Sequence, residues 1–184
     1  MVSLKFSLYF IQMNTAIRQA AKADANLISV LSAVTFYEAY FEQDSANNLA
    51  NYITETFAPE KMRTEIEDPN SIFFIIFKDE KAVGYAKLRT GEPHESVKNE
   101  PAIELQRIYI LERVFGAGIG EILLGHSIKI ARKKGFKVIW LGVWEENRRA
   151  QKFYAKYGFE QVGTLRFPYG KEVGTNLVLQ KILK

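Results

Sequence analysis

The chain has 184 residues, of which 47% are hydrophobic and 13% aromatic, as expected for one globular domain with a substantial core. The formal net charge is +4, and the 25 basic residues are interleaved with 21 acidic ones, so nucleic acid is not favoured as a partner. The chain contains no cysteine, which excludes disulfides, thiolate zinc sites and a cysteine acyl-enzyme and fits a cytoplasmic location.

The N-terminal residues are the one stretch with an unusual composition. Residues 1–13 are apolar and aromatic around a single Lys5, and we interpret them as an extension upstream of a start at Met13. No run approaches the ~18 apolar residues of a membrane span, so no membrane association is expected. Residues 14–184 are predicted to form a single domain.

Apolar periodicity predicts the elements in chain order. A strand at 15–20 leads to a helix for which Asp24 is the expected N-cap, with Leu27, Ile28, Leu31 and Val34 on its buried face. Short helices follow at about 45–57 and 59–67. The later elements are predicted as helices after Gly118 and over 147–157, and as strands at 71–78, 82–89, 102–110, 137–143, 158–167 and 173–183. This order predicts a mixed α/β layer architecture.

The stretch 108–120 runs from an apolar strand through the glycine-rich loop Gly116-Ala117-Gly118-Ile119-Gly120 into a helix. No Ser, Thr, Asp or Asn stands at the helix start to accept its first N–H groups, so these donors need an outside partner, and a phosphate suits them. A Walker loop is excluded because Glu121 and Ile122 follow Gly120. A dinucleotide fingerprint is excluded because Glu121 occupies the position of its third glycine.

A second motif lies at 147–159, where Asn147 opens a helix, Ala150 and Tyr154 follow, and Gly158 ends it. Together, residues 115–120 and this motif resemble the two cofactor motifs of the GNAT N-acetyltransferases. The pyrophosphate loop of that family has the pattern Gln/Arg-x-x-Gly-x-Gly/Ala, and Phe115 stands where Gln or Arg is usual. With the segment 141–145, the chain is most similar to the bacterial spermidine/spermine N-acetyltransferase branch.

The resemblance implies a GNAT-type α/β fold with a central, mostly antiparallel sheet of about seven strands and helices on both faces. It also implies acetyl-CoA as co-substrate, no metal, a small amine as acceptor, and a monomer or homodimer. The residues expected to hold acetyl-CoA are Ile108, Tyr109, Ile110, Phe115, Gly116, Ala117, Gly118, Ile119, Gly120, Glu121, Asn147, Arg149, Lys152 and Tyr154.

Acetyl transfer to an amine needs a base for the ammonium proton, a donor for the oxyanion and an acid for the departing thiolate. The resemblance assigns the backbone N–H of Ile108 as oxyanion donor and Tyr154 as general acid. Glu104 is the candidate general base, because it precedes Ile108 by four residues on the same strand face; His94 and His126 are secondary candidates. Since there is no cysteine, direct attack in a ternary complex is expected.

The acceptor is expected to be a primary amine, with a polyamine such as spermidine or spermine as first candidate. Acidic residues support this, because they are predicted to line a cation-attracting cleft: Glu38, Glu42, Glu92, Glu95, Glu100 and Glu104. Tyr37, Tyr40 and Phe41 are assigned to either an interface or this cleft. The alternatives are a protein N-terminus, a lysine or an antibiotic amine as acceptor, or a non-catalytic acyl-CoA-binding sensor.

Overall fold

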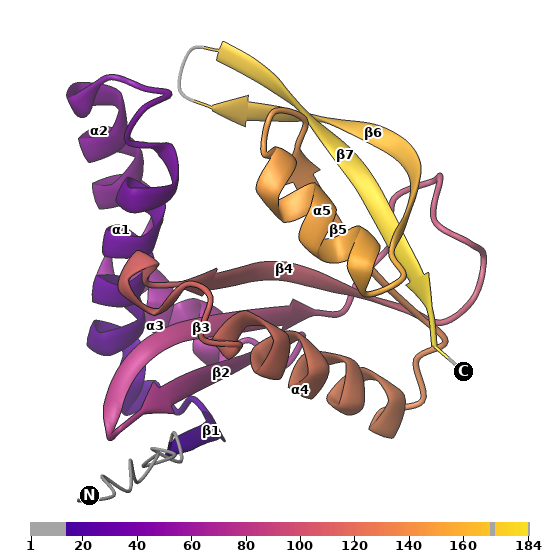
Figure 1. Cartoon of the computed structure of the whole chain (residues 1–184), viewed down its shortest axis with the longest axis horizontal. Helices are drawn as coiled ribbons and strands as arrows, with labels where there is room; N and C mark the ends of the chain where they lie inside the picture. The colour runs from indigo at the N-terminus through magenta and orange to yellow at the C-terminus, as the bar shows by residue number, and fades with distance from the viewer. Residues whose placement is uncertain (1–13, 170–171, 184) are drawn as a thin grey trace, which may run out of the picture.

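The computed structural model describes residues 14–169 and 172–183, so the expected extension at 1–13 lies outside the described residues. Its centre is a seven-stranded sheet in the order β1-β2-β3-β4-β5-β7-β6 (Figure 1), antiparallel throughout except for the β4–β5 pair. The strands are β1 (Thr15–Gln19), β2 (Ser71–Lys78), β3 (Lys81–Arg89), β4 (Ala102–Ile110), β5 (Val138–Trp144), β6 (Glu160–Tyr169) and β7 (Glu172–Ile182).

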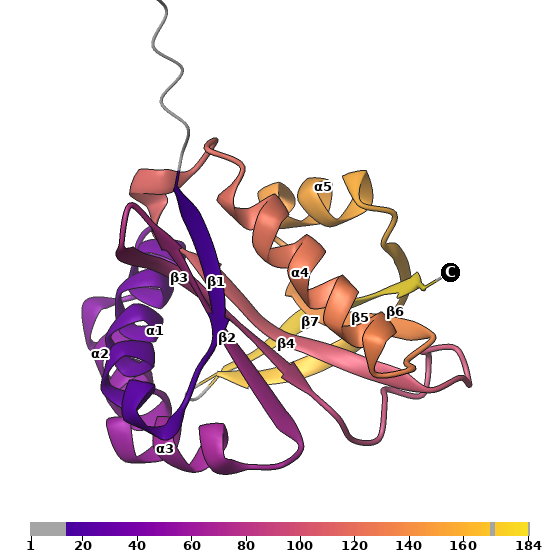
Figure 2. The same ribbon diagram turned by 90° about the horizontal axis from the view of Figure 1, so that it is seen from below.

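The helices cover both faces of the sheet (Figure 2). One face carries α1 (Ala25–Tyr40), α2 (Ala46–Thr56) and α3 (Pro59–Glu67), and the other carries α4 (Ile119–Lys133) and α5 (Arg148–Lys156). The predicted fold class is therefore confirmed, and every predicted helix and strand is present with ends that differ by at most two residues.

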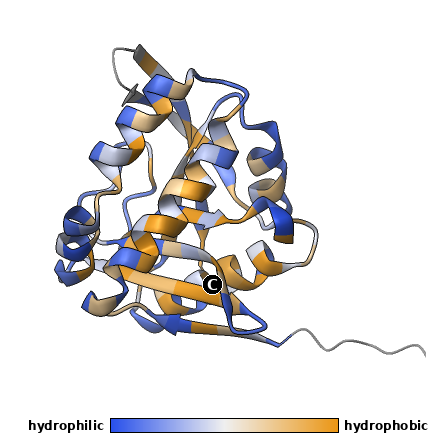
Figure 3. Ribbon diagram, turned by 90° about the vertical axis from the view of Figure 1, so that its left-hand side faces the viewer, coloured by the Kyte–Doolittle hydropathy of each residue, from blue (hydrophilic) through white to orange (hydrophobic). Residues whose placement is uncertain are grey.

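Each face of the sheet has its own hydrophobic core. Beneath α4 the core gathers around Leu123, Leu124 and the strand residue Leu88, whereas Ile28, Met62 and others fill the core under α1 to α3. Hydrophobic residues accordingly dominate the central strands, and hydrophilic residues gather at turns and helix ends (Figure 3). None of the helices within the described ranges is long and apolar enough to cross a membrane.

The predicted N-cap of α1 is confirmed, but one residue of its predicted buried face is wrong. Asp24 occupies the N-cap position, although its carboxylate makes no capping bond to the helix; it pairs with Arg18 at 2.7 Å and accepts the Ala21 N–H at 2.8 Å. Val34 is 37% exposed, because the helix turns Leu31 and its neighbours toward the sheet instead.

The sheet divides in the middle. The pairing between β4 and β5 covers only the first three residues of β4 and ends at Glu104 and Trp140. Beyond this point β4 stays paired with β3, while β5 continues with β7, so the two halves of the sheet diverge (Figure 1). This gap positions the site described next.

Candidate active site

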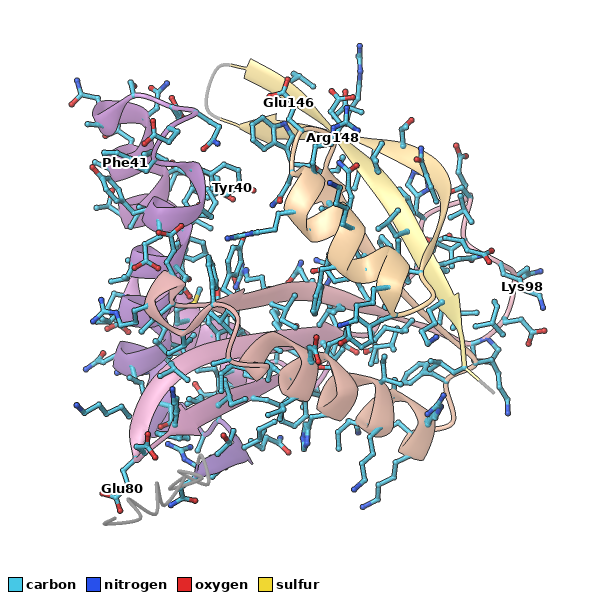
Figure 4. All side chains as sticks on the ribbon, viewed as in Figure 1. Tyr40, Phe41, Glu80, Lys98, Glu146 and Arg148 are labelled. Atoms are coloured by element: carbon cyan, nitrogen blue, oxygen red, sulfur yellow. The ribbon has the colours of Figure 1, made fainter. Side chains whose placement is uncertain are left out.

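A cleft of about 710 Å³ opens where the two halves of the sheet diverge. One wall consists of α1, α2 and β4, and the other of β5 and α5, with the α4 loop at one end. In Figure 4, Tyr40 points from α1 toward the α5 side, whereas Phe41 points away from it. The cleft has the size of a cofactor and substrate site.

The glycine loop places uncapped amides at the end of this cleft. Gly116 and Gly118 both have φ +76°, a left-handed conformation that favours glycine, and Gly118 is the N-cap of α4 without a side-chain capping bond. The first backbone bond of the helix runs from the Ile122 N–H to the Gly118 carbonyl at 3.1 Å. The amides of 119–121 therefore have no acceptor within the helix, as the sequence predicted, and form a ready anion site.

Backbone groups of β4 also face the cleft. The Leu111 N–H donates to the Val83 carbonyl at 2.9 Å, and bonded and non-bonded pairs alternate along an antiparallel ladder. Tyr109 therefore turns its backbone groups toward β3, whereas Ile108 and Ile110 turn theirs toward the gap. With β5 diverging here, the sheet presents an edge that an extended ligand can pair with, and the Ile108 N–H is the donor assigned to the oxyanion.

The helix α5 brings its motif residues to the opposite wall. The Asn147 side chain accepts the Ala150 N–H at 3.0 Å, so it caps the helix as well as lining the cleft. Tyr154 lines the cleft and is 8% exposed, with its ring packed against Phe153 and Phe159. Burial, with a smaller contribution from Tyr40, raises the pKa of Tyr154, so its hydroxyl stays a hydrogen-bond donor.

Arg149 extends over the glycine loop from α5. Its guanidinium carbon lies 4.0 Å from the centroid of the Phe115 ring, and both residues line the cleft. The loop position at which the family carries Gln or Arg thus holds an aromatic platform, and an arginine from another element stacks on it. The contact brings a positive charge to the phosphate end of the cleft.

The wall formed by α1, α2 and β4, which we name the acceptor wall, borders a partly buried group of charges, the Glu65 cluster, formed by Glu65, Lys87 and Arg107. The Glu65 carboxylate accepts from Lys87 at 2.7 Å and from Arg107 at 2.6 and 3.1 Å. Burial opposes ionisation of Glu65, but its hydrogen bonds with the two cations outweigh burial and lower its pKa. Burial lowers the pKa of Lys87, which is only partly offset by Glu65. Of the three, only Arg107 lines the cleft.

The sequence matches the Acetyltransferase (GNAT) family over residues 33–159, which is more than half of the chain. This chain belongs to the GNAT family. An uncharacterized N-acetyltransferase of Lactobacillus delbrueckii subsp. lactis is 28% identical over 165 residues, covering 90% of this chain and 95% of that protein. A spermidine N(1)-acetyltransferase of Thermoplasma acidophilum is 26% identical over 152 residues, covering 80% and 89% respectively.

Solved structures of GNAT proteins share the fold. The PaiA N-acetyltransferase of T. acidophilum, solved in complex with coenzyme A, superposes with a TM-score of 0.76 at 23% identity, over 92% of this chain and 99% of that one. The chain is accordingly an acetyltransferase of the acetyl-CoA-dependent type.

The structure brings most of the predicted cofactor residues of this GNAT protein into one cleft. Ala117 and Lys152 are the exceptions, because neither lines it. Glu121 lines the cleft, and its carboxylate pairs with Lys156 at 2.8 Å. The cleft residues that match the prediction are Ile108, Tyr109, Ile110, Phe115, Gly116, Gly118, Ile119, Gly120, Glu121, Asn147, Arg149 and Tyr154.

Glu104 lies away from this cleft. Its carboxylate pairs with Arg89 at 2.7 Å in a separate small pocket, beside Trp140 at the closed end of the β4–β5 gap. Burial raises the pKa of Glu104, although the charge of Arg89 partly offsets this. Its assignment as general base stays a prediction, and from this position the carboxylate reaches the cleft only through intervening groups or water.

The other candidate titratable residues are also dispersed. His94 bonds to the Ser96 hydroxyl at 2.8 Å, and His126 packs its ring edge to face with Phe74; neither lines the cleft. Of the six acidic residues expected to form a cation-attracting cleft, Glu38 alone lines it, where it accepts the Glu112 N–H at 2.9 Å. Among the described residues, no three His, Cys, Asp or Glu side chains are grouped to hold a metal.

Three aromatic and basic side chains complete the wall formed by α1, α2 and β4. Tyr40, for which the sequence left an interface or the cleft open, lines the cleft and contacts the Trp144 ring with centroids 5.8 Å apart, thereby linking the two walls. Tyr52 and Arg107 line the same wall, yet nothing in their local sequence distinguishes them from packing or surface residues. Their proximity results from the packing of α1 on β4 and of α2 on α1.

Proposed function

We propose that this GNAT protein transfers the acetyl group of acetyl-CoA to a primary amine by direct attack in a ternary complex. The proposal rests on two sets of unpaired backbone donors that face the same cleft. One set is at the N-terminus of α4, and the other is on the part of β4 that is not paired with β5. The first suits a pyrophosphate and the second an extended pantetheine chain. We place the reaction in the cytoplasm.

Each remaining contact follows from this orientation. The amides of 119–121 and Arg149 bind the phosphates, Asn147 and the Ile110 backbone bind the pantetheine arm, and the Ile108 N–H meets the carbonyl oxygen of the thioester. The α4 loop lies on one face of the sheet, so the acceptor approaches from the α1 and α2 face, where Tyr40 and Tyr52 line the cleft.

The bond changes assign a task to Tyr154. The acceptor ammonium first loses one proton to a base or water. The free amine nitrogen then forms a bond to the acetyl carbon as the carbon–sulfur bond breaks, and the second proton that the nitrogen loses balances the one that the thiolate takes up. Tyr154 donates a hydrogen bond to this thiolate. Burial raises the pKa of Tyr154, which keeps its hydroxyl protonated and able to donate a hydrogen bond to the sulfur as negative charge develops there.

A polyamine is the first acceptor candidate by relationship, since a distant relative is named as a spermidine acetyltransferase. The test is thiol release from acetyl-CoA with spermidine, spermine, a lysine peptide, an aminoglycoside and small amino acids, alongside calorimetric binding of acetyl-CoA. Turnover with any amine supports the proposal. Binding without turnover on any amine supports the sensor alternative, and absence of binding refutes the assigned cofactor site.

A further inference from the structure

The acceptor wall of the cleft has a positive charge that no side chain of the cluster neutralises. Within the Glu65 cluster, one carboxylate faces two cations at 2.6–2.7 Å, which leaves one positive charge in excess. The neighbouring Arg89–Glu104 pair is balanced, so it does not remove this excess. A charge at such a site is costly unless an anion compensates for it.

Arg107 is the member of the cluster that can meet a ligand. Its side chain is only 14% exposed, yet it lines the cleft beside Tyr52 and Tyr109. Glu65 engages two of the five N–H donors of its guanidinium, and the hydrogen bonds of the described residues include no other acceptor for Arg107. The remaining donors suit a carboxylate, the anion that matches the planar geometry of arginine.

The position of Arg107 on the strand specifies which substrate it meets. It directly precedes Ile108, whose backbone N–H is assigned to the acetyl carbonyl, but its side chain lies on the α3 face with Glu65 and against the Phe57 ring. That is the acceptor face, opposite the phosphate loop. A small molecule that carries both an amine and a carboxylate therefore spans the distance between the thioester and the guanidinium.

The acidic residues of the cleft lie elsewhere. Glu112 and Glu121 belong to the loop end, and Glu38 bonds to the Glu112 amide. In the described part of the chain, the carboxylate that pairs with Arg107 is that of Glu65, and Glu38, Glu112 and Glu121 make no hydrogen bond or ion pair with it.

We propose that the acceptor is a small amine bearing a carboxylate, such as an amino acid, and that Arg107 of the Glu65 cluster binds the carboxylate and directs the amine to the thioester. The inference rests on the proposed acetyl transfer and specifies its substrate class. It predicts the opposite charge preference to that of a polyamine acetyltransferase.

The test compares matched acceptors that differ only in charge. β-Alanine and γ-aminobutyrate are each assayed against their own amides and against spermidine, with thiol release as the readout. We expect kcat/KM to favour each carboxylate over its amide by about 10- to 100-fold, the effect of one charge-assisted hydrogen bond. In Arg107→Gln this ratio should fall to near one, and Arg107→Lys should restore part of it.

Arg63→Gln is the matched control, because it removes an equal charge from exposed α3 surface outside the cleft. It should leave the ratio unchanged, and all variants should bind acetyl-CoA as the wild type does. If Arg107→Gln does not fold, the carboxylate-to-amide ratio of kcat/KM in Arg107→Lys is the deciding measurement. Lysine keeps the charge but loses the planar guanidinium, so this ratio should lie below that of the wild type and above one. Equal or better use of amides and spermidine by the wild type, or a carboxylate preference that survives Arg107→Gln, would overturn the inference.

A second readout separates this inference from the proposed function. Glutarate and its diamide are titrated calorimetrically into the protein with coenzyme A present, which requires no turnover. Binding of glutarate but not of the diamide, if it depends on Arg107, supports the carboxylate site. This holds even if no amine is acetylated, because absence of acetylation would refute the proposed acetyl transfer and not the carboxylate site. Equal binding of the two compounds, or no binding of either, counts against the carboxylate site.

Discussion

The two ligand sites that we propose in the cleft are built by different means. The proposed cofactor site, here named the cofactor wall, relies on backbone: the uncapped amides of α4, the unpaired edge of β4 and the left-handed Gly116 and Gly118. The acceptor wall relies on side chains from α1, α2 and β4, among them Tyr40, Tyr52 and Arg107. A backbone site tolerates many sequences and keeps one ligand, whereas a side-chain site can change its ligand by single substitutions, so the chemistry is set at one wall and the specificity at the other.

Removal of the Tyr154 hydroxyl should have the largest effect on activity. Tyr154 is a side chain on which the otherwise backbone-based cofactor site depends. Tyr154→Phe should lower kcat by about 10²- to 10³-fold with acetyl-CoA affinity unchanged, as measured by steady-state kinetics and calorimetry. Because burial raises the pKa of Tyr154 above its usual value of about 10, the hydroxyl stays protonated at all working pH values. The loss should therefore be the same factor at each pH from about 6 to 9.

Tyr157→Phe is the matched control, because Tyr157 follows α5 but does not line the cleft. It should leave kcat unchanged. A Tyr154→Phe enzyme with full activity would remove Tyr154 from the reaction.

A backbone site should fail when the backbone is strained. Gly118→Val places a β-branched residue at φ +76°, which costs about 1–3 kcal/mol and displaces the loop, so acetyl-CoA affinity should fall by about 100-fold in calorimetry. Gly125→Ala, in the interior of α4 with open space around a Cβ, should bind normally and gain about 0.5–1 kcal/mol in unfolding free energy. Normal acetyl-CoA binding by Gly118→Val would contradict the loop assignment.

The Arg149 contact tests whether a side chain supplements the cofactor wall. Arg149→Gln should weaken acetyl-CoA binding by about tenfold, since it removes one charge-assisted hydrogen bond to a phosphate, and should reduce the salt dependence of binding. The adjacent Arg148→Gln, an exposed arginine (Figure 4) that does not line the cleft, should change neither quantity. Equal effects of the two substitutions would show that only the overall charge matters.

The smallest effect should come from Glu104. Because its carboxylate pairs with Arg89 outside the cleft, Glu104→Gln should lower kcat by less than about threefold and leave the pH dependence of kcat/KM unchanged. A loss of about 100-fold together with loss of the acidic limb of the pH profile would instead place Glu104 in the proton path, as the sequence analysis proposed.

Local sequence was enough to predict the order of the helices and strands, their approximate ends, the fold class and the uncapped glycine loop before α4. These features depend on local sequence: on apolar periodicity, and on Gly118 at a helix start that has no capping residue. Both can be recognised without knowledge of the tertiary contacts. Asn147 and Tyr154 could be found for the same reason, because their spacing is set within one helix.

Only the tertiary structure decided which side chains meet at the acceptor wall. Glu65 lies 22 residues before Lys87 and 42 residues before Arg107, and the three meet because α3 packs on the sheet at β2, the neighbour of β3. Strand alternation predicted Glu104 on the same face as Ile108, and this was wrong: the β3–β4 register shifts at Lys87 and Leu88 and leaves Gln106 as an extra residue, so Leu105 shares the core face with Ile108 instead. Glu104 lies at the closed end of the gap, where the β4–β5 pairing ends. From the sequence, acidic residues were predicted to line the cleft. The excess positive charge at Arg107 arises only in the folded chain, which brings together three charged side chains from α3, β3 and β4.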